Sequence, residues 1–556
     1  MELNAFSDRL LRARNPETGL WTGRLSSSAV ATATAAAALR LAGAENHAPL
    51  VRNALDFLAR TVNADGGWGD SPESPSNPTA ALLGYGALNL SRDPNHAAIR
   101  AAARGYLTKH FGGLDADRLV PGVGGLYGAD ATFAAPILAF CAGAGLISWA
   151  AVPRLPFELS LLPRALYRWA NLPVVSYALP ALISLGLAKR KNSIFRNACL
   201  RRLSAMQPAS GGFLEAAPLT SFCAICLNEA GLRDSEAAKK ALSFLENTVR
   251  EDGAWAIDSD LGQWVGFLAV AALGGERFPE EERRTMAERI KAGQYKTVHP
   301  FNGAQPGGWG WTLRDGAVPD ADDTSAALIA LHELAPEGYD DAVAAGLRWL
   351  MDTQNRDGGM PTFCRGWGAL PFDRSCPDIS AHAWRALAVW RDAPPGAAMK
   401  NRIRRACSRL IGYLRKNISP EGCFYPLWFG DQAAPDLRAP IYGAAAALEH
   451  LAGAAEAADF TPRAARYLLD AQNPDGGWGG APGVRSGWIM TARATRALRD
   501  CAMPGAQAAR AGGLDFLRRN GAMARIPEPV GLYFANLWYS EALYNDIFAA
   551  AAVRDG

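Results

Sequence analysis

The sequence has little net charge and few signs of β structure. Its 57 lysines and arginines are nearly balanced by 54 aspartates and glutamates, which leaves a formal net charge of +3. This balance gives no support for a nucleic-acid partner, because proteins that bind nucleic acids concentrate basic residues. Almost no segment alternates apolar and polar residues, as half-buried strands do. The 556 residues, 49% of them hydrophobic, therefore predict a mainly helical chain of two to four domains.

Cysteine pairs typical of zinc sites and a secretory signal are also lacking. The nine cysteines are scattered, and Cys223-x-x-Cys226 has no second pair to complete a metal site. An odd number of cysteines in a large chain indicates reduced thiols in the cytoplasm. The first 14 residues mix acids and bases along an amphipathic helix, unlike a signal peptide. We therefore expect a cytoplasmic protein without a metal ion or other cofactor.

A glycine turn, usually followed by an aromatic residue, recurs along the chain. Successive copies lie roughly 40 to 65 residues apart, apart from one longer gap, and such a period indicates a helical array. The better copies follow a helix that ends in glutamine and precede a helix rich in Ala and Leu. This unit predicts either an open solenoid or a closed α/α toroid. The copies span residues 65–68, 210–213, 252–255, 306–309, 357–360 and 475–478, with degenerate copies at residues 19–21 and 422–424.

The longer gap contains two stretches without charge, residues 133–152 and 169–188. Each has about the length of a membrane span, but Pro136, Pro173 and Pro180 interrupt them. Between them, residues 153–169 interleave Leu, Phe and Trp with Arg, a pattern that fits a surface dipping into one leaflet. The uncharged stretches are equally compatible with buried helices of a barrel.

Three carboxylates crowd into the sequence Asp320-Ala321-Asp322-Asp323, and apolar residues follow at once. Like charges this close cannot all ionise away from water, so at least one carboxyl should stay protonated. A protonated carboxyl aimed into a pocket can give its proton to a group that is not a base. A helix cap or a cation-binding loop would also use aspartates. The glycine and glutamate that an EF-hand-like loop requires are absent, which disfavours the metal interpretation.

Asp-x-Asp-Asp-Thr and the repeated Gln-x-x-x-Gly-Gly-Trp turns together resemble the squalene-hopene cyclase family of class II terpene cyclases, over essentially the whole chain. The resemblance implies an all-α fold of two α/α barrels. One barrel would comprise residues 1–17 and 290–556, and the other would be inserted as residues 18–289. It also implies an enzyme attached to the inner face of the cell membrane through about residues 152–169, taking an apolar isoprenoid from the bilayer. The sequence is also compatible with a homodimer.

The resemblance also assigns catalytic roles. Asp322, the middle aspartate, would donate the proton, and Asp320 and Asp323 would hold the surrounding hydrogen bonds. His382 would support the donor through a hydrogen bond. Asp378 lies four residues before His382, so on a helix the two share a face and the carboxylate can orient the imidazole.

A carbocation needs walls that stabilise it without reacting, and aromatic faces do this through their quadrupole. At positions that the resemblance places along the cavity, the chain carries aromatic residues. Each one alone is equally compatible with core packing. The predicted lining residues are Trp264, Trp311, Phe363, Tyr533, Phe534, Trp538 and Tyr539.

Some positions depart from the family pattern at the late end of the predicted cavity. Ala217 replaces a glutamine beside a proline, Thr34 replaces a glutamate, and Pro529-Val530 replaces Phe-Pro. Squalene is the expected substrate, but these departures predict a product other than plain hopene.

Three alternative functions were considered for the same motifs. A shorter prenyl diphosphate could be cyclised with its diphosphate retained, held by Mg²⁺ or by Arg154, Arg164 and Arg168. Protein prenyltransferase β-subunits share the toroid and bind zinc, but Cys364 with His382 is an incomplete ligand set. A non-catalytic toroid that binds lipid or protein would leave the three aspartates unexplained.

Overall fold

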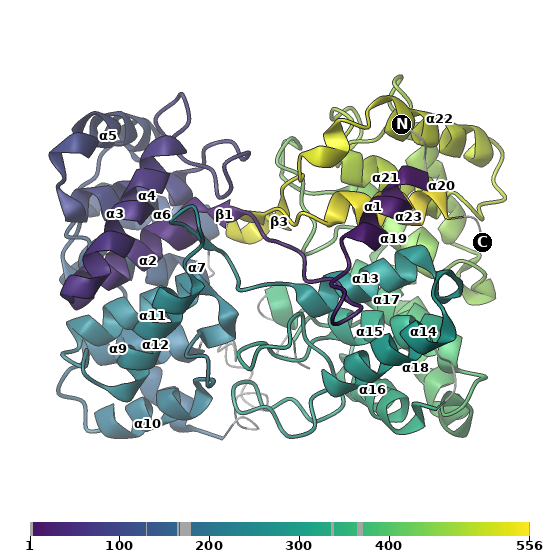
Figure 1. The fold of residues 1–556 in the computed structure, drawn as a ribbon, viewed down its shortest axis with the longest axis horizontal. Coiled ribbons are helices and arrows are strands. Elements are labelled where there is room, and N and C mark those ends of the chain that lie inside the picture. The colour runs from purple at the N-terminus through teal and green to yellow at the C-terminus, as the bar shows by residue number, and fades with distance from the viewer. Residues whose placement is uncertain are drawn as a thin grey trace.

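The computed structural model describes residues 4–128, 131–163, 166, 179–334, 338–363 and 371–554. Helices form two lobes that lie side by side in Figure 1. Within the described residues, four short strands form two antiparallel pairs: β1 (Ser27–Ser28) with β2 (Trp255–Ala256), and β3 (Val530–Leu532) with β4 (Leu537–Tyr539). The all-α prediction is therefore confirmed.

The first lobe is an α/α barrel whose inner helices are α2 (Ala29–Ala42), α4 (Pro78–Ser91), α7 (Ala131–Gly143), α9 (Leu179–Lys189) and α11 (Ala217–Glu229). Each packs on the next, and α11 packs back on α2. The outer helices are α3 (Ala48–Arg60), α5 (Ala97–Phe111), α6 (Ala116–Tyr127), α10 (Arg196–Met206) and α12 (Glu236–Thr248). Alanine and leucine dominate the inner helices because these are buried on nearly every side.

The second lobe is a ring of six inner helices. They are α13 (Gly262–Leu273), α15 (Ala321–Leu334), α17 (Pro377–Trp390), α19 (Pro440–His450), α21 (Trp488–Ala497) and α23 (Tyr544–Val553), and α23 packs on α13 to close the ring. Outside lie α14 (Glu280–Ala292), α16 (Asp340–Thr353), α18 (Lys400–Asn417), α20 (Thr461–Asp470) and α22 (Ala506–Arg519). The N-terminal α1 (Asn4–Arg12) packs on α23, so both ends of the chain belong to this lobe (Figure 1).

Short 3₁₀ helices connect these elements. They are η1 (Glu45–His47), η2 (Pro94–His96), η3 (Trp149–Ala151), η4 (Phe157–Leu161), η6 (Phe213–Glu215), η7 (Gly275–Arg277), η8 (Pro371–Asp373), η9 (Gly396–Met399), η10 (Ala455–Ala457), η11 (Met523–Arg525) and η12 (Tyr533–Ala535).

The chain passes from α1 into the first barrel and returns to the second at α13. The expected boundary after residue 289 is too late, because α13 and α14 pack within the second ring, where Val265 and Met286 share one core with Trp309. The amino-acid pattern alone does not reveal this boundary. An apolar helix can join either ring, and only tertiary contacts decide which.

Each repeated turn is bonded to the outer helix before it and to the outer helix after it. The Gln354 side-chain amide donates to the carbonyl of Gly358 in its own turn, at 2.7 Å, and to that of Ala406 in the next outer helix, at 3.1 Å. Gly358 needs its left-handed φ of +98°, and a Cβ there would lie 2.6 Å from the Arg409 carbonyl oxygen. Gln207, Gln294 and Gln472 repeat this pattern. The indoles of Trp68, Trp255, Trp309 and Trp478 each donate to a carbonyl of the preceding outer helix.

Within the described residues, the two uncharged stretches contribute inner helices to the first barrel. The first contains α7, with Pro136 inside it, and the second ends in α9. Among the described residues, no helix is long and apolar enough to span a bilayer. Arg164, Arg168, Trp169 and Pro173 lie outside the described residues.

We predict that Gln354→Ala destabilises the second barrel. The change removes two buried hydrogen bonds, which are typically worth about 0.5–1.5 kcal/mol each. In a domain of this size that lowers the melting temperature by about 2–4 °C per kcal/mol. Gln305→Ala, at an exposed position near another turn, is the matched control and should melt like the wild type. Equal melting temperatures for both variants would contradict the role of the glutamine.

Candidate active site

The acid motif begins α15. The side chain of Asp320 accepts hydrogen bonds through Oδ1 from the backbone N–H groups of Asp322 and Asp323, both at 2.8 Å, as a helix cap does. Neighbouring turns hold the start of the helix in place. Asp320 N–H donates to the Trp309 carbonyl at 3.0 Å, and Ala321 N–H donates to that of Thr362 at 2.9 Å. The capping interpretation therefore holds for Asp320 and leaves the carboxyl of Asp322 available.

Asp320 and Asp323 form a buried carboxyl pair joined by a side-chain hydrogen bond. Burial raises the pKa of both groups. The charge of Asp320 raises the pKa of Asp323 further, whereas hydrogen bonds with Asp323 lower the pKa of Asp320, which still rises to about 7. A hydrogen bond between two carboxyl groups needs one proton, so the pair shares at least one at neutral pH.

Asp322 pairs with a histidine instead. Its Oδ1 lies 2.6 Å from Nδ1 of His382, on α17. The side chain of Asp322 is 20% exposed, whereas that of His382 is 8% exposed. An Nδ1–H donated to Oδ1 stabilises the carboxylate that would remain after Asp322 loses a proton.

Asp378 lies on the face of α17 that carries His382, as its spacing predicted. Its Oδ1 accepts a hydrogen bond from the Cys376 thiol at 2.6 Å. Burial and then the charge of Asp322 raise the pKa of Asp378 to about 6. The imidazole of His382 makes its hydrogen bond to Asp322, so the predicted orienting bond from Asp378 is not the contact that fixes it.

An aromatic cluster lies between the two barrels, beside the start of α15. The ring of Trp311 lies 6.2 Å from that of Phe363, which contacts Phe372 at 5.3 Å. Phe372 in turn lies 5.6 Å from Phe534, and Phe534 lies 6.4 Å from Phe133 of the first barrel. The two barrels thus contribute to one apolar cluster that adjoins the acid motif.

Phe133, Phe372 and Trp428 belong to this cluster but were not predicted. Trp428 packs on Phe363 at 6.0 Å and on Phe372 at 5.2 Å. The signal in the sequence was the aromatic pair Trp428-Phe429, which resembles any other core segment without the fold.

Other predicted lining residues lie elsewhere. The rings of Trp264 and His382 lie edge to face with centroids 6.4 Å apart, and the indole N–H of Trp264 donates to the Tyr544 hydroxyl at 3.0 Å. The Tyr539 hydroxyl lies 3.4 Å from that of Tyr544. Tyr533 contacts Phe534 at the edge of the aromatic cluster. Trp538 is fully buried and its backbone N–H donates to Asp70, so it packs apart from the cluster.

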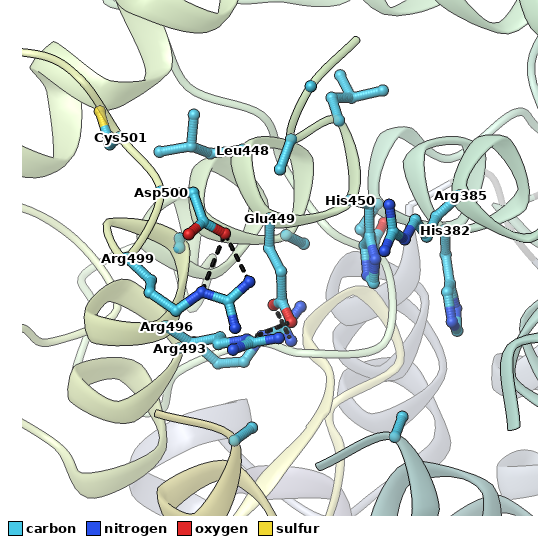
Figure 2. A pocket seen from close by; sticks show the side chains of 18 of the residues that line it. His382, Arg385, Leu448, Glu449, His450, Arg493, Arg496, Arg499, Asp500 and Cys501 are labelled. Atoms are coloured by element: carbon cyan, nitrogen blue, oxygen red, sulfur yellow. Dashed lines mark hydrogen bonds and ion pairs between the residues drawn. The ribbon is translucent and has the colours of Figure 1, made fainter. Parts of the chain in front are cut away.

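On the other side of Asp322 the structure contains a cavity of about 970 Å³. All six inner helices of the second ring line it, and Asp322, Asp378 and His382 are among the lining residues. Figure 2 shows a charged wall formed by Glu449, Arg493 and Arg496. These residues were not predicted, because polar residues near helix ends are normally solvated.

Among the described residues, no group of three or more His, Cys, Asp or Glu side chains is arranged to hold a metal ion. Cys364, considered as a zinc ligand, lies outside the described residues.

Two family models match the chain: the squalene-hopene cyclase N-terminal domain over residues 3–178 and the C-terminal domain over residues 285–487. The chain therefore belongs to the squalene-hopene cyclase family of class II terpene cyclases.

Named relatives differ in what they make. A drimenyl diphosphate synthase from Streptantibioticus cattleyicolor is 36% identical over 191 residues, 34% of this chain and 33% of that protein. A squalene–hopene cyclase from Bradyrhizobium diazoefficiens is 24% identical over 517 residues, 76% of this chain and 72% of that protein. The match to enfumafungin synthase of Hormonema carpetanum, 23% identical, spans 76% of this chain and only 38% of that protein.

The fold is shared by a solved structure, the ent-copalyl diphosphate synthase from Streptomyces platensis. It superposes with a TM-score of 0.62 at 19% identity and covers 99% of this chain and 98% of that chain. This likeness supports the two-barrel fold.

We predict that His382→Ala folds normally but cyclises slowly. Loss of a charge-assisted hydrogen bond of about 1.5–3 kcal/mol corresponds to roughly 10- to 150-fold in rate. Circular dichroism and product formation measure the two effects, and His110→Ala, at an exposed position on α5, is the control. Stoichiometric zinc that disappears in His382→Ala would instead indicate a metal ligand.

Proposed function

We propose that the chain protonates the terminal double bond of a linear isoprenoid with Asp322 and cyclises it beside the aromatic cluster. The observation that carries this proposal is the 2.6 Å contact between Asp322 Oδ1 and His382 Nδ1. Asp322 stands apart from the Asp320–Asp323 pair and is partly exposed, so its carboxyl is the one available to a substrate.

The chemistry needs no cofactor. The proton of Asp322 adds to one alkene carbon and leaves a tertiary cation at the other, and successive double bonds attack this cation to form rings. The faces of Trp311 and Phe363 stabilise the early cations by about 0.5–2 kcal/mol each. Loss of a proton from the last cation, or addition of water to it, ends the reaction.

The motifs and the relatives support two candidate substrates. The sequence motifs favour squalene, and the squalene–hopene cyclase relatives match over most of the chain. The drimenyl diphosphate synthase, at 36% identity, favours a shorter prenyl diphosphate that keeps its diphosphate. Arg438 supports the second candidate, because its guanidinium lies 5.8 Å over the ring of Tyr533 at the edge of the cluster. We propose a prenyl diphosphate as the first substrate to test and squalene as the second.

We also propose that the enzyme attaches to the inner face of the cell membrane from one side. Exposed Leu161 and Leu166 lie in the predicted segment, and exposed Ile194 and Phe195 follow α9. Arg190 and Lys191 precede this pair. Apolar side chains beside basic ones suit the boundary between headgroups and acyl chains.

Asp322→Asn should abolish turnover while the fold survives, because the amide keeps the size but has no acidic proton. Positioned proton transfer contributes about 10²–10⁴-fold even in ordinary cases. Detergent-solubilised protein is incubated with farnesyl diphosphate, geranylgeranyl diphosphate and squalene, and products are identified by mass spectrometry. Asp315→Asn, at an exposed position seven residues earlier, is the control.

Wild-type turnover in Asp322→Asn would refute the assignment of the donor. Cyclised product from squalene alone would refute the diphosphate, and a clean single hopene peak would show that Ala217, Thr34 and Pro529-Val530 do not alter the product. No cyclised product from any of the three would refute the proposed function with these substrates.

We predict that the protein sediments with membranes and needs detergent for release. Ile194→Asp with Phe195→Asp should shift it toward the soluble fraction, because charges at these positions oppose insertion. Ile526→Asp, an exposed site in the second barrel, is the control. Complete release of the wild type by salt alone would indicate purely electrostatic binding, and protease access from both faces would indicate a span.

A further inference from the structure

A buried carboxylate ties the first barrel to the loop before α15. Glu215, at the end of η6, is fully buried. Its Oε1 accepts hydrogen bonds from the Ser210 hydroxyl at 2.6 Å and from the backbone N–H of Gly316 at 3.0 Å, and its Oε2 accepts one from the Ser259 hydroxyl at 2.9 Å. Leu214 and Glu215 both have a φ of +55°, a left-handed conformation that residues other than glycine keep only where surrounding contacts impose it. The proposed cyclisation gives this strained turn and its carboxylate no role.

A second carboxyl group, that of Asp258, lies opposite this turn, on the segment that leads from β2 to α13. Ala216 and Asp258 form a β-bridge, and the backbone N–H of Ser259 donates to Asp258 Oδ1 at 2.9 Å. Burial and then the negative charge of Glu215 raise the pKa of Asp258 well above its usual value. The two carboxyl groups therefore hold one proton, on Asp258, and one negative charge, on Glu215, at neutral pH.

Asp258 faces the interior between the two barrels. Its side chain is only half-buried, although the segment that carries it is enclosed by both barrels. The indole N–H of Trp311, a member of the aromatic cluster, is directed to its carboxyl group. Burial raises the pKa of Tyr539, and negative charge on Glu541, Asp258 or Asp323 raises it further, so this tyrosine lies within reach of Asp258 and of the acid motif. Asp258 thus adjoins the same interior as the acid motif and the aromatic cluster.

An oxygen atom beside the aromatic cluster has a chemical consequence. Aromatic faces stabilise a cation without reacting with it, whereas an oxygen lone pair takes a proton from it or adds to it. The place where such an oxygen first meets the growing ring system therefore decides how many rings form. We propose that Asp258 sets the end of the cyclisation by holding the water molecule that takes the proton from the last cation; the inference rests on the proposed function.

The step balances in atoms and electrons. A C–H bond next to the cationic carbon breaks, its electron pair forms the double bond of the product, and the proton moves to the oxygen of the water. The carbonyl oxygen of the Asp258 carboxyl accepts a hydrogen bond from this water, which leaves a lone pair of the water free to face the cation. The negative charge of Glu215 behind Asp258 stabilises the positive charge that the water takes up, and the proton leaves for solvent with the product. Asp258 is a positioning residue, because it acts through the water.

The test separates the end of the reaction from its start. Asp258→Leu removes the group that holds the water at similar size, whereas Asp258→Asn keeps a carbonyl oxygen in place. With farnesyl diphosphate, geranylgeranyl diphosphate and squalene, products are quantified by gas chromatography and mass spectrometry. In Asp258→Leu, the ratio of the wild-type product to all other cyclised products should fall about tenfold or more, because positioned proton transfer contributes about 10²–10⁴-fold. In Asp258→Asn this ratio should stay within about twofold of the wild type.

Substrate consumption should change by less than about threefold in both variants, because Asp322 commits the substrate before Asp258 acts. Asp260→Asn is the matched control, since the carboxylate of Asp260 pairs with exposed Arg314 at 3.0 Å. It should leave the product ratio and the rate of consumption unchanged.

Three results would overturn the proposal. The first is a wild-type product ratio in Asp258→Leu, and the second is an equal change of the ratio in Asp258→Leu and Asp258→Asn. The third is a loss of substrate consumption as large as the change in products, which would assign Asp258 to holding Trp311 against the early cations. Absence of cyclised product from the wild type with all three substrates would instead refute the proposed function.

Discussion

The buried glutamine amides fix the geometry on which the site depends. Each one binds a glycine carbonyl in its turn and a carbonyl of the next outer helix, so two outer helices cannot move independently. The indole of Trp309 adds a bond to the preceding outer helix. The same turn carries the carbonyl that binds Asp320 N–H. The start of α15, and with it the orientation of Asp322, is therefore set by contacts that reach the outer helices α14 and α16.

The three aspartates of the motif have different roles because their surroundings differ. Asp320 caps the helix and shares a proton with Asp323 in a buried pair. Asp322 has a histidine partner and partial exposure. The arrangement gives the site one partly exposed carboxyl with a histidine partner and a neighbouring buried pair that holds its proton. Similar separation of titratable groups by environment underlies many acid–base sites.

The sequence was sufficient to find the acid motif, the repeated turns and the pairing of Asp322 with His382. These features depend on local spacing or on a resemblance that spans the chain. The boundary near α13 was missed because an apolar helix carries no information on which ring it closes. The stacking of His450 on His382 was missed because it joins residues 68 positions apart, on helices whose facing sides are defined only when the ring closes. Trp538 shows the converse error, because an aromatic residue beside the predicted lining serves to fill the core.

The inner helices of the second ring share one direction, and this has an electrostatic consequence. The aromatic residues Trp311, Phe363 and Phe372 precede helix starts, whereas Glu333, Arg385 and Arg496 at the charged cavity lie toward helix ends. Each helix has a positive N-terminal end and a negative C-terminal end. A carbocation beside the aromatic cluster would therefore face the positive ends of several dipoles at once. The electron-rich ring faces and the carboxylate left on Asp322 must offset this field. Proton transfer thus creates a negative charge on Asp322 at the same moment as the cation, and this carboxylate serves as its counterion.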